Sequence, residues 1–158
     1  MRSPLVEALG LAAHPEGGWF RETWRAPETV ETSDGRTRAT ATLIHFLLHA
    51  GESSAWHRVR SDEVWHLLEG GPLRLWLMPP ALDAVQAVTL GPVDDAGTVP
   101  RHVVPAQWWQ AAEPLGAYAY VGATVGPGFD FADFSFLRAD AAACERLTAL
   151  MPELQRLL

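Results

Sequence analysis

Short apolar runs interrupted by turn residues are the main pattern along this chain. The run at 39–49 is rich in Thr, Leu and Ile, which is typical of a strand covered on both faces. A polar loop at 26–38 precedes it, and glycine or proline separates most of the later runs. Many short strands between such turns indicate a barrel or jelly roll, so the predicted fold class is all-β. The predicted strands are 17–25, 39–49, 53–59, 63–69, 72–78, 85–90, 101–104, 107–112, 117–125 and 130–137.

The two ends of the chain change from this pattern to helical spacing. Ser3 to Leu11 predicts a short helix with Ser3 as its N-cap. Near the carboxyl end, apolar residues recur at three- and four-residue steps, which predicts an amphipathic helix over 140–157 with Asp140 as its cap. Pro152 is expected to kink or restart this helix, which we expect to cover an open end of the barrel. The residues that make up the apolar stripe are Leu147, Leu150, Met151, Leu154 and Leu158.

Length and charge narrow the class of protein. With 158 residues, of which 48% are hydrophobic, the chain can bury one substantial core, so a single domain over 1–158 is predicted, with the barrel at about 17–137. The formal net charge is −7 and the chain contains no lysine. Because nucleic acid binding requires clustered Lys and Arg, a nucleic acid partner is not expected.

The sequence also bears on where the protein is located and on whether it can form a disulfide. The chain contains no apolar stretch of the roughly 20 residues that cross a bilayer, so no membrane partner is expected. Glu7 interrupts the first apolar segment, which argues against a secretory signal and makes the cytoplasm the expected location. Cys144 is the only cysteine, so an internal disulfide cannot form.

The segment from Gly51 to Gly70, GESSAWHRVRSDEVWHLLEG, carries the candidate chemistry. It predicts two strands joined by a tight turn, and strand side chains alternate between faces. If both inner faces point into the barrel, the imidazole of His57 and the carboxylate of Glu63 meet inside it. His66 then points the other way. A buried carboxylate needs a partner, because desolvating it costs several kcal/mol.

Four positions of this segment resemble the first motif of the cupin superfamily. Gly51, His57, Glu63 and Gly70 match that motif, while Val59 stands where a second histidine is usual. The stretch Pro105 to Gln110 resembles the second cupin motif, with Gln107 in the place of glycine and Gln110 in the place of histidine. The resemblance therefore implies that two of the four usual metal ligands are changed.

Further segments resemble one small family, the fifth cupin family, which is of unknown function. Its members are similar in fold to sugar-nucleotide epimerases and seed storage proteins. The resemblance implies a homodimer in which sheets of two subunits pack together. The segments that carry it are HPEGGWFRETWR at 14–25, SDEVWHLLEGGPL at 61–73, VPAQWWQAA at 104–112 and VGATVGPGFDFADFSFL at 121–137.

Candidate site residues follow from parity and from the motifs. His57 is the candidate base and Glu63 the group that orients it, with Tyr118 or Tyr120 as the acid. A metal site of His57, Glu63 and Gln110 is an alternative, weakened because an amide binds borderline metals less well than imidazole. The candidate ligand-binding residues are Trp65, Trp108, Gln110, Arg21 and His66.

Aromatic residues admit two interpretations each. Trp65 and Trp108 share predicted faces with Glu63 and Gln110, so they either wall the pocket or belong to the core. The phenylalanines of PGFDFADFSF are expected to serve core and interface packing, and Asp130 and Asp133 to bind a backbone turn.

Three functions remain open from the sequence. The first is isomerase or epimerase chemistry on a small polar or carbohydrate-like ligand. The second is a non-catalytic ligand-binding cupin, and the third is a metal-dependent oxygenase or decarboxylase. The expected cofactor is none or a weakly held divalent metal ion.

Overall fold

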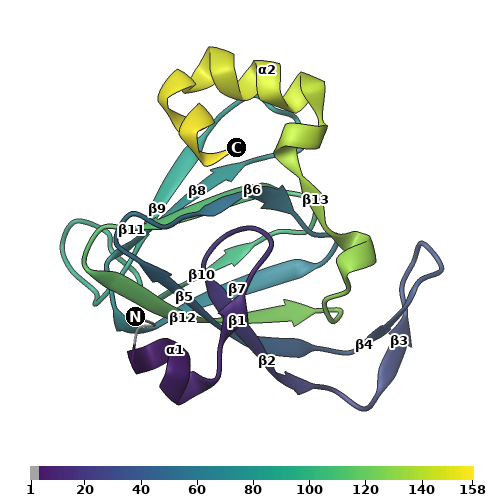
Figure 1. The fold of residues 1–158 in the computed structure, drawn as a ribbon. Helices are drawn as coiled ribbons and strands as arrows, with labels where there is room; N and C mark the ends of the chain where they lie inside the picture. The colour runs from purple at the N-terminus through teal and green to yellow at the C-terminus, as the bar shows by residue number, and fades with distance from the viewer. Residues whose placement is uncertain (1–3) are drawn as a thin grey trace.

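The computed structural model describes residues 4–158, which form a barrel of two antiparallel sheets (Figure 1). The six-stranded sheet has the order β1-β2-β5-β12-β7-β10, and the five-stranded sheet has the order β13-β6-β11-β8-β9. The all-β jelly-roll fold predicted from the sequence is confirmed. The strands of the first sheet are β1 Ala12–Ala13, β2 Trp19–Arg25, β5 Thr42–His49, β7 Asp62–Gly70, β10 Arg101–Val104 and β12 Tyr118–Gly126. Those of the second are β6 Ser54–Arg58, β8 Leu73–Met78, β9 Gln86–Leu90, β11 Trp109–Pro114 and β13 Ser135–Phe136.

Strict alternation of side chains explains how the sheets enclose one core. Along β12, Ala119, Val121, Ala123 and Val125 are buried, while the residues between them are partly exposed. The inward side chains of both sheets meet in one apolar cluster that includes Phe46, Trp65 and Leu75. Burial of this cluster is the main stabilising contribution to the barrel.

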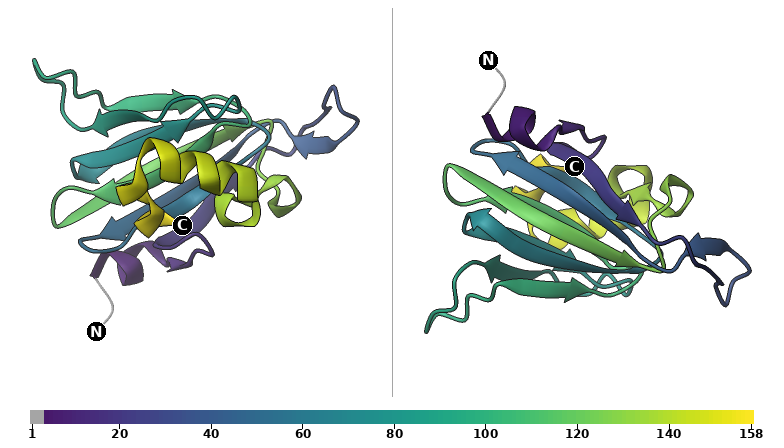
Figure 2. Two further views of the ribbon diagram at one scale, coloured as in Figure 1. Left: turned by 90° about the horizontal axis from the view of Figure 1, so that it is seen from above. Right: turned by 90° about the horizontal axis from the view of Figure 1, so that it is seen from below.

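The carboxyl end differs from the prediction in where it packs. Helix α2 Ala141–Leu150 has the predicted cap, because Asp140 Oδ1 accepts a hydrogen bond from the Ala143 amide at 3.0 Å. The chain then restarts at Pro152 as the 3₁₀ helix η3 Pro152–Leu157, as expected for a proline. These helices cover the outer face of the five-stranded sheet (Figures 1 and 2). Expecting them to close an open end of the barrel was wrong, because Trp56 and Trp109 give this sheet a second apolar face that needs cover.

Two local predictions changed, and the predicted amino-terminal helix is confirmed. The segment 130–137, predicted as one strand, instead contains the 3₁₀ helix η1 Phe131–Asp133, the two-residue strand β13 and the start of a second 3₁₀ helix, η2 Leu137–Ala139. The expected loop at 26–38 contains a hairpin of β3 Thr29–Glu31 and β4 Thr37–Ala39, which projects from the barrel (Figure 1). The amino-terminal helix α1 runs over Pro4–Leu9, and its expected cap Ser3 lies outside the described residues. Within residues 4–158, no helix is both long and apolar enough to cross a membrane.

Candidate functional site

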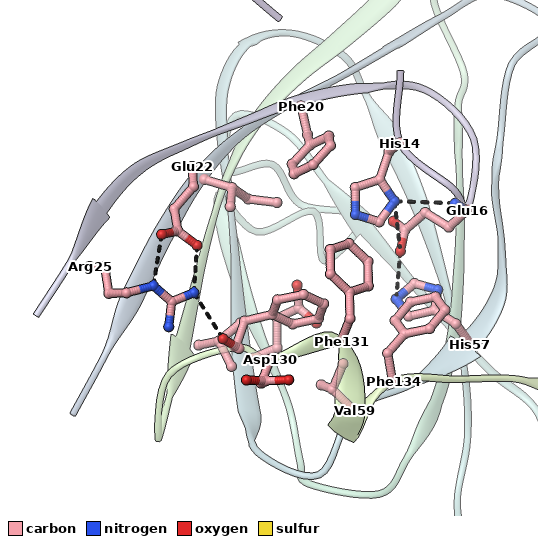
Figure 3. A pocket seen from close by; sticks show the side chains of 14 residues that line it. His14, Glu16, Phe20, Glu22, Arg25, His57, Val59, Asp130, Phe131 and Phe134 are labelled. Atoms are coloured by element: carbon pink, nitrogen blue, oxygen red, sulfur yellow. Dashed lines mark hydrogen bonds and ion pairs between the residues drawn. The ribbon is translucent and has the colours of Figure 1, made fainter. Parts of the chain in front are cut away.

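A cavity of about 250 Å³ lies between the two sheets and is closed on one side by the segment 129–134 (Figure 3). Its wall combines apolar rings with a small number of titratable groups, as is usual for small-molecule sites. The residues that line it are His14, Glu16, Phe20, Glu22, Arg25, Ile44, His57, Val59, Glu63, Val125, Phe129, Asp130, Phe131 and Phe134.

His57 on β6 and Glu63 on β7 both line this cavity, at the positions the sequence predicts. They are 2% and 7% exposed. His57 Nδ1 lies 2.8 Å from the Ala55 carbonyl oxygen, which can only accept, so Nδ1 carries the proton and Nε2 has a free lone pair. Burial lowers the pKa of His57, so the imidazole is neutral, and the Phe134 ring stacks on it at 5.1 Å.

Glu16, which is not among the residues predicted from the sequence, is the nearest carboxyl group to this imidazole. Its Oε2 lies 3.3 Å from His57 Nε2, and its Oε1 accepts a hydrogen bond from Ser54 Oγ at 2.8 Å. Burial raises the pKa of Glu16 to about 8. Glu16 is therefore protonated at neutral pH and can donate to the lone pair of His57 Nε2. The pair can hold one proton between Glu16 Oε2 and His57 Nε2, which lie 3.3 Å apart.

A glycine pair places Glu16 in the cavity. Gly17 and Gly18 have φ values of +106° and +71°, which other residues rarely adopt. The turn is closed by hydrogen bonds between His14 and the two glycines. A Cβ atom on Gly17 would lie 2.1 Å from the Ser53 carbonyl oxygen, so the turn also packs directly against the backbone just before β6. The paired glycines after a carboxylate were the sequence signal that could have identified Glu16.

Glu63 is held by a chain of buried hydrogen bonds. Trp65 Nε1 donates to Gln110 Oε1 at 2.8 Å, and Gln110 Nε2 donates to Glu63 Oε2 at 2.5 Å. An indole nitrogen can only donate, so it fixes which end of the Gln110 amide faces Glu63. Burial raises the pKa of Glu63 to about 7, while His57 and the Gln110 amide act in the opposite direction. Glu63 can therefore gain or lose a proton near neutral pH.

The chemistry of this donor set does not fit the metal site predicted at His57, Glu63 and Gln110. Gln110 turns its amide NH₂ group toward Glu63, and an NH₂ group is not a metal ligand. Val59 lines the cavity where a second imidazole is usual in the superfamily. Over residues 4–158, no group of three His, Cys, Asp or Glu side chains is arranged to hold a metal ion. Gln110 is not oriented as the predicted metal ligand, because its oxygen faces the Trp65 indole and its NH₂ group faces Glu63.

We expect Trp65→Phe to raise the pKa of Glu63 above its value of about 7. Without the indole donor, the Gln110 amide can turn its oxygen toward Glu63, which favours the protonated carboxyl group. The lost buried hydrogen bond should also lower the free energy of unfolding by about 1–3 kcal/mol beyond the packing loss. Carboxyl carbon NMR titration measures the first effect and chemical denaturation the second.

Trp56→Phe is the matched control for this prediction. Trp56 is also fully buried, but its Nε1 has no hydrogen-bond partner among residues 4–158. Its replacement should cost packing alone and leave the titration of Glu63 unchanged. Equal titration curves for the two variants would show that the indole does not orient the amide.

Several predicted site residues lie away from this cavity. Tyr118 and Tyr120 alternate with inward Ala119 and Val121, so their phenols lie on the outer face, where they bond Glu69 and His45. Placing a tyrosine beside His57 was wrong for this reason. Trp65 and Trp108 pack in the core, because that part of the barrel is filled by apolar side chains. Arg21 is exposed on β2 opposite His45, and His66 points outward, as its parity predicts, into a separate hollow with Arg101 and Thr124.

Phenylalanines of the segment 129–134 wall the cavity, whereas core and interface packing was the role expected for them from the sequence. Phe131 and Phe134 face it (Figure 3), and Phe129 also lines it. Asp130 caps η1 by accepting from the Ala132 amide at 2.8 Å, which confirms its expected turn role. Asp133 is instead buried against Arg36 and Arg38, with contacts of 2.6 to 2.9 Å. These ion pairs hold the segment over the cavity.

Comparison with known proteins places this chain in a family. Residues 3–137 match the family model described as "Cupin superfamily (DUF985)". The chain is 28% identical over 151 residues to the uncharacterized protein YML079W of Saccharomyces cerevisiae, which covers 86% of this chain and 75% of the yeast protein.

Solved structures agree with this match over the full length. A hypothetical protein from Leishmania major has 27% identity and a TM-score of 0.81, covering 97% of this chain and 96% of that one. Protein SO0799 from Shewanella oneidensis has 29% identity and a TM-score of 0.81, covering 99% and 98%. More distant matches include oxalate decarboxylase from Bacillus subtilis, at 16% identity and a TM-score of 0.60 over 92% of this chain and 36% of that one. A likeness at that level shows the fold alone.

Proposed function

The chain belongs to the cupin superfamily, and from that premise we propose that it is an enzyme that transfers a proton on a small bound molecule, as isomerases and epimerases do. One observation carries the proposal. Glu63 and the Glu16–His57 pair face the same buried cavity, and each can exchange a proton near neutral pH. General acid–base catalysis is most effective when the pKa of the group lies near the working pH.

The proposed roles differ in part from those expected from the sequence. The sequence predicts His57 as the base, but the lone pair of its Nε2 faces Glu16 at 3.3 Å. Glu63 is the better base, since Gln110 binds one carboxylate oxygen and the residue lines the cavity. Glu63 would take a proton from a carbon next to a carbonyl group, and the carbonyl oxygen would receive the proton held by the Glu16–His57 pair. Return of both protons, with the first delivered to a new position or face, completes an isomerisation.

A small polar or carbohydrate-like ligand fits this wall. Phenylalanine rings offer flat apolar surfaces for the C–H faces of a ring, while the carboxyl groups supply hydrogen bonds. The volume of about 250 Å³ lies just below the range of roughly 300–1,000 Å³ usual for sites of drug-sized ligands. The ligand is therefore expected to be small.

Deuterium uptake from D₂O tests the proposal directly. A panel of monosaccharides and small hydroxyketones is incubated with the protein in D₂O, and C–H exchange is followed by proton NMR. Glu63→Gln and His57→Gln should each lower exchange by about 10²–10⁴-fold, because each removes a proton-transfer group. Both substitutions keep a polar side chain of related shape, so ligand binding should persist.

Glu69→Gln is the control, because this carboxylate is exposed on the outer face and bonds Tyr118. The Glu69→Gln variant should catalyse deuterium exchange at the same rate as the unaltered protein.

A ligand that binds in the cavity but takes up no deuterium would instead support a non-catalytic binding protein. The changed positions Val59 and Gln110 favour that second function, because they remove metal chemistry without impairing a binding cavity. The arrangement of His57, Glu63 and Gln110 gives no support to the third function, a metal-dependent oxygenase or decarboxylase. A homodimer and a cytoplasmic location both stay predictions.

A further inference from the structure

The charges around the cavity constrain what can enter it. Arg25 is the only arginine in its wall as described over residues 4–158, and the chain has no lysine. Its Nε and Nη2 donate to Glu22 Oε1 and Oε2 at 2.9 and 2.8 Å, a bidentate ion pair at the edge of the cavity (Figure 3). Nη2 also donates to the Phe129 carbonyl oxygen at 3.0 Å. The Nε and Nη2 groups of Arg25 therefore donate to protein acceptors, and the Glu22 carboxylate neutralises the guanidinium charge.

Within the described part of the chain, none of the remaining polar side chains of the wall is a second cation, because burial lowers the pKa of both His14 and His57. Glu63 is 7% exposed, and its Oε2 is the oxygen bonded to Gln110, which leaves Oε1 for a ligand. Asp130 adds a carboxyl group to those of Glu16, Glu22 and Glu63 in the wall. Two donors near Glu63, the Trp65 indole and the Gln110 amide, are already used within the protein. Such a wall pairs with ligand hydroxyl groups, which donate, and repels a phosphate group, which only accepts and carries negative charge.

We propose that the cavity takes an uncharged, hydroxyl-rich small molecule and rejects its phosphate ester, and that Glu22 sets this selectivity by neutralising Arg25. This deepens the proposed function by naming the charge of the ligand. Nucleoside diphosphate sugars are excluded both by charge and by the volume of about 250 Å³. Removal of the Glu22 charge would leave Arg25 free to bind an anion at the same edge.

Matched pairs of probes test this charge selectivity. Glucose and mannose are compared with their 6-phosphates, and N-acetylglucosamine with its 6-phosphate, by titration of ¹H–¹⁵N spectra. In the unaltered protein the free sugar should bind at least about tenfold more tightly than its phosphate, as expected for a like-charge penalty. In Glu22→Gln the phosphate should gain about tenfold in affinity, while the free sugar changes by less than about twofold.

Two further variants locate the effect. Adding Arg25→Gln to Glu22→Gln should remove the gain in phosphate affinity, because the gain depends on the freed guanidinium group. Glu31→Gln removes an exposed carboxylate from the β3–β4 hairpin, outside the cavity wall, and should leave the preference unchanged.

Each outcome bears on the inference separately from the proposed function. Equal or tighter binding of the phosphates by the unaltered protein would overturn it, as would an unchanged preference in Glu22→Gln. Failure of every free sugar in the panel to bind would overturn it as well. A free sugar that binds with the expected preference but takes up no deuterium would overturn the proposed enzyme function and leave the charge selectivity standing.

Discussion

Glu16→Gln should stabilise the protein by up to about 5 kcal/mol at pH 8 and above, and hardly at all at pH 4.5. Burial raises the pKa of Glu16 from 4.5 to about 8, so the folded state holds a proton that the unfolded chain releases between these values. Stability is therefore lost as pH rises from 4.5 to 8. Glutamine imitates the protonated carboxyl group, since it can accept from Ser54 and donate to His57. Denaturant unfolding of both proteins from pH 4.5 to 9 measures the difference.

Glu113→Gln serves as the control, because this substitution should lower the stability of the protein where Glu16→Gln raises it. Arg156 lies 2.7 Å from Glu113 and lowers the pKa of that carboxyl group, so the folded state favours its charged form. Its glutamine variant should lose stability above about pH 4.5, the ordinary pKa of the group, and none well below it. A pH-independent difference between Glu16→Gln and the unaltered protein would show that Glu16 ionises alike in the folded and unfolded states.

Gly17→Ala should destabilise the protein by roughly 3 kcal/mol or more and displace Glu16 from the cavity. Two costs add. The φ of +106° strains any residue with a Cβ atom, and that atom would lie 2.1 Å from the Ser53 carbonyl oxygen. Because the obstacle is backbone, it cannot rotate away as a flexible side chain would. Chemical denaturation measures the loss, and the deuterium exchange assay should show loss of activity as well.

Gly35→Ala separates these two costs. Gly35 has a φ of +82° in the β3–β4 hairpin, but a Cβ atom there meets nothing within 4 Å. It should lose only about 1–2 kcal/mol from backbone strain and keep the cavity intact. Similar losses in the two variants would show that the turn at Gly17 yields, and that Glu16 does not depend on it.

Local periodicity explains which parts of the site the sequence could predict. Alternation along β6 and β7 places His57 and Glu63 on inward faces, and it correctly turns His66 outward. The same alternation turns Tyr118 and Tyr120 outward, so the tyrosine prediction failed because the direction of that face was not known. Parity tells which residues share a face of one strand. It does not tell which face is the inside.

The sequence by itself determined the barrel, the capped carboxyl-terminal helix and the inward pair His57 and Glu63, because each depends on spacing within a short segment. Only the tertiary structure decided that Glu16 joins His57, that Gln110 presents its NH₂ group, and that the helix covers a sheet face. Glu16 and His57 lie on separate elements, and the Gln110 amide is oriented by an indole 45 residues away. Such contacts have no sequence period, since they depend on which elements the fold brings together.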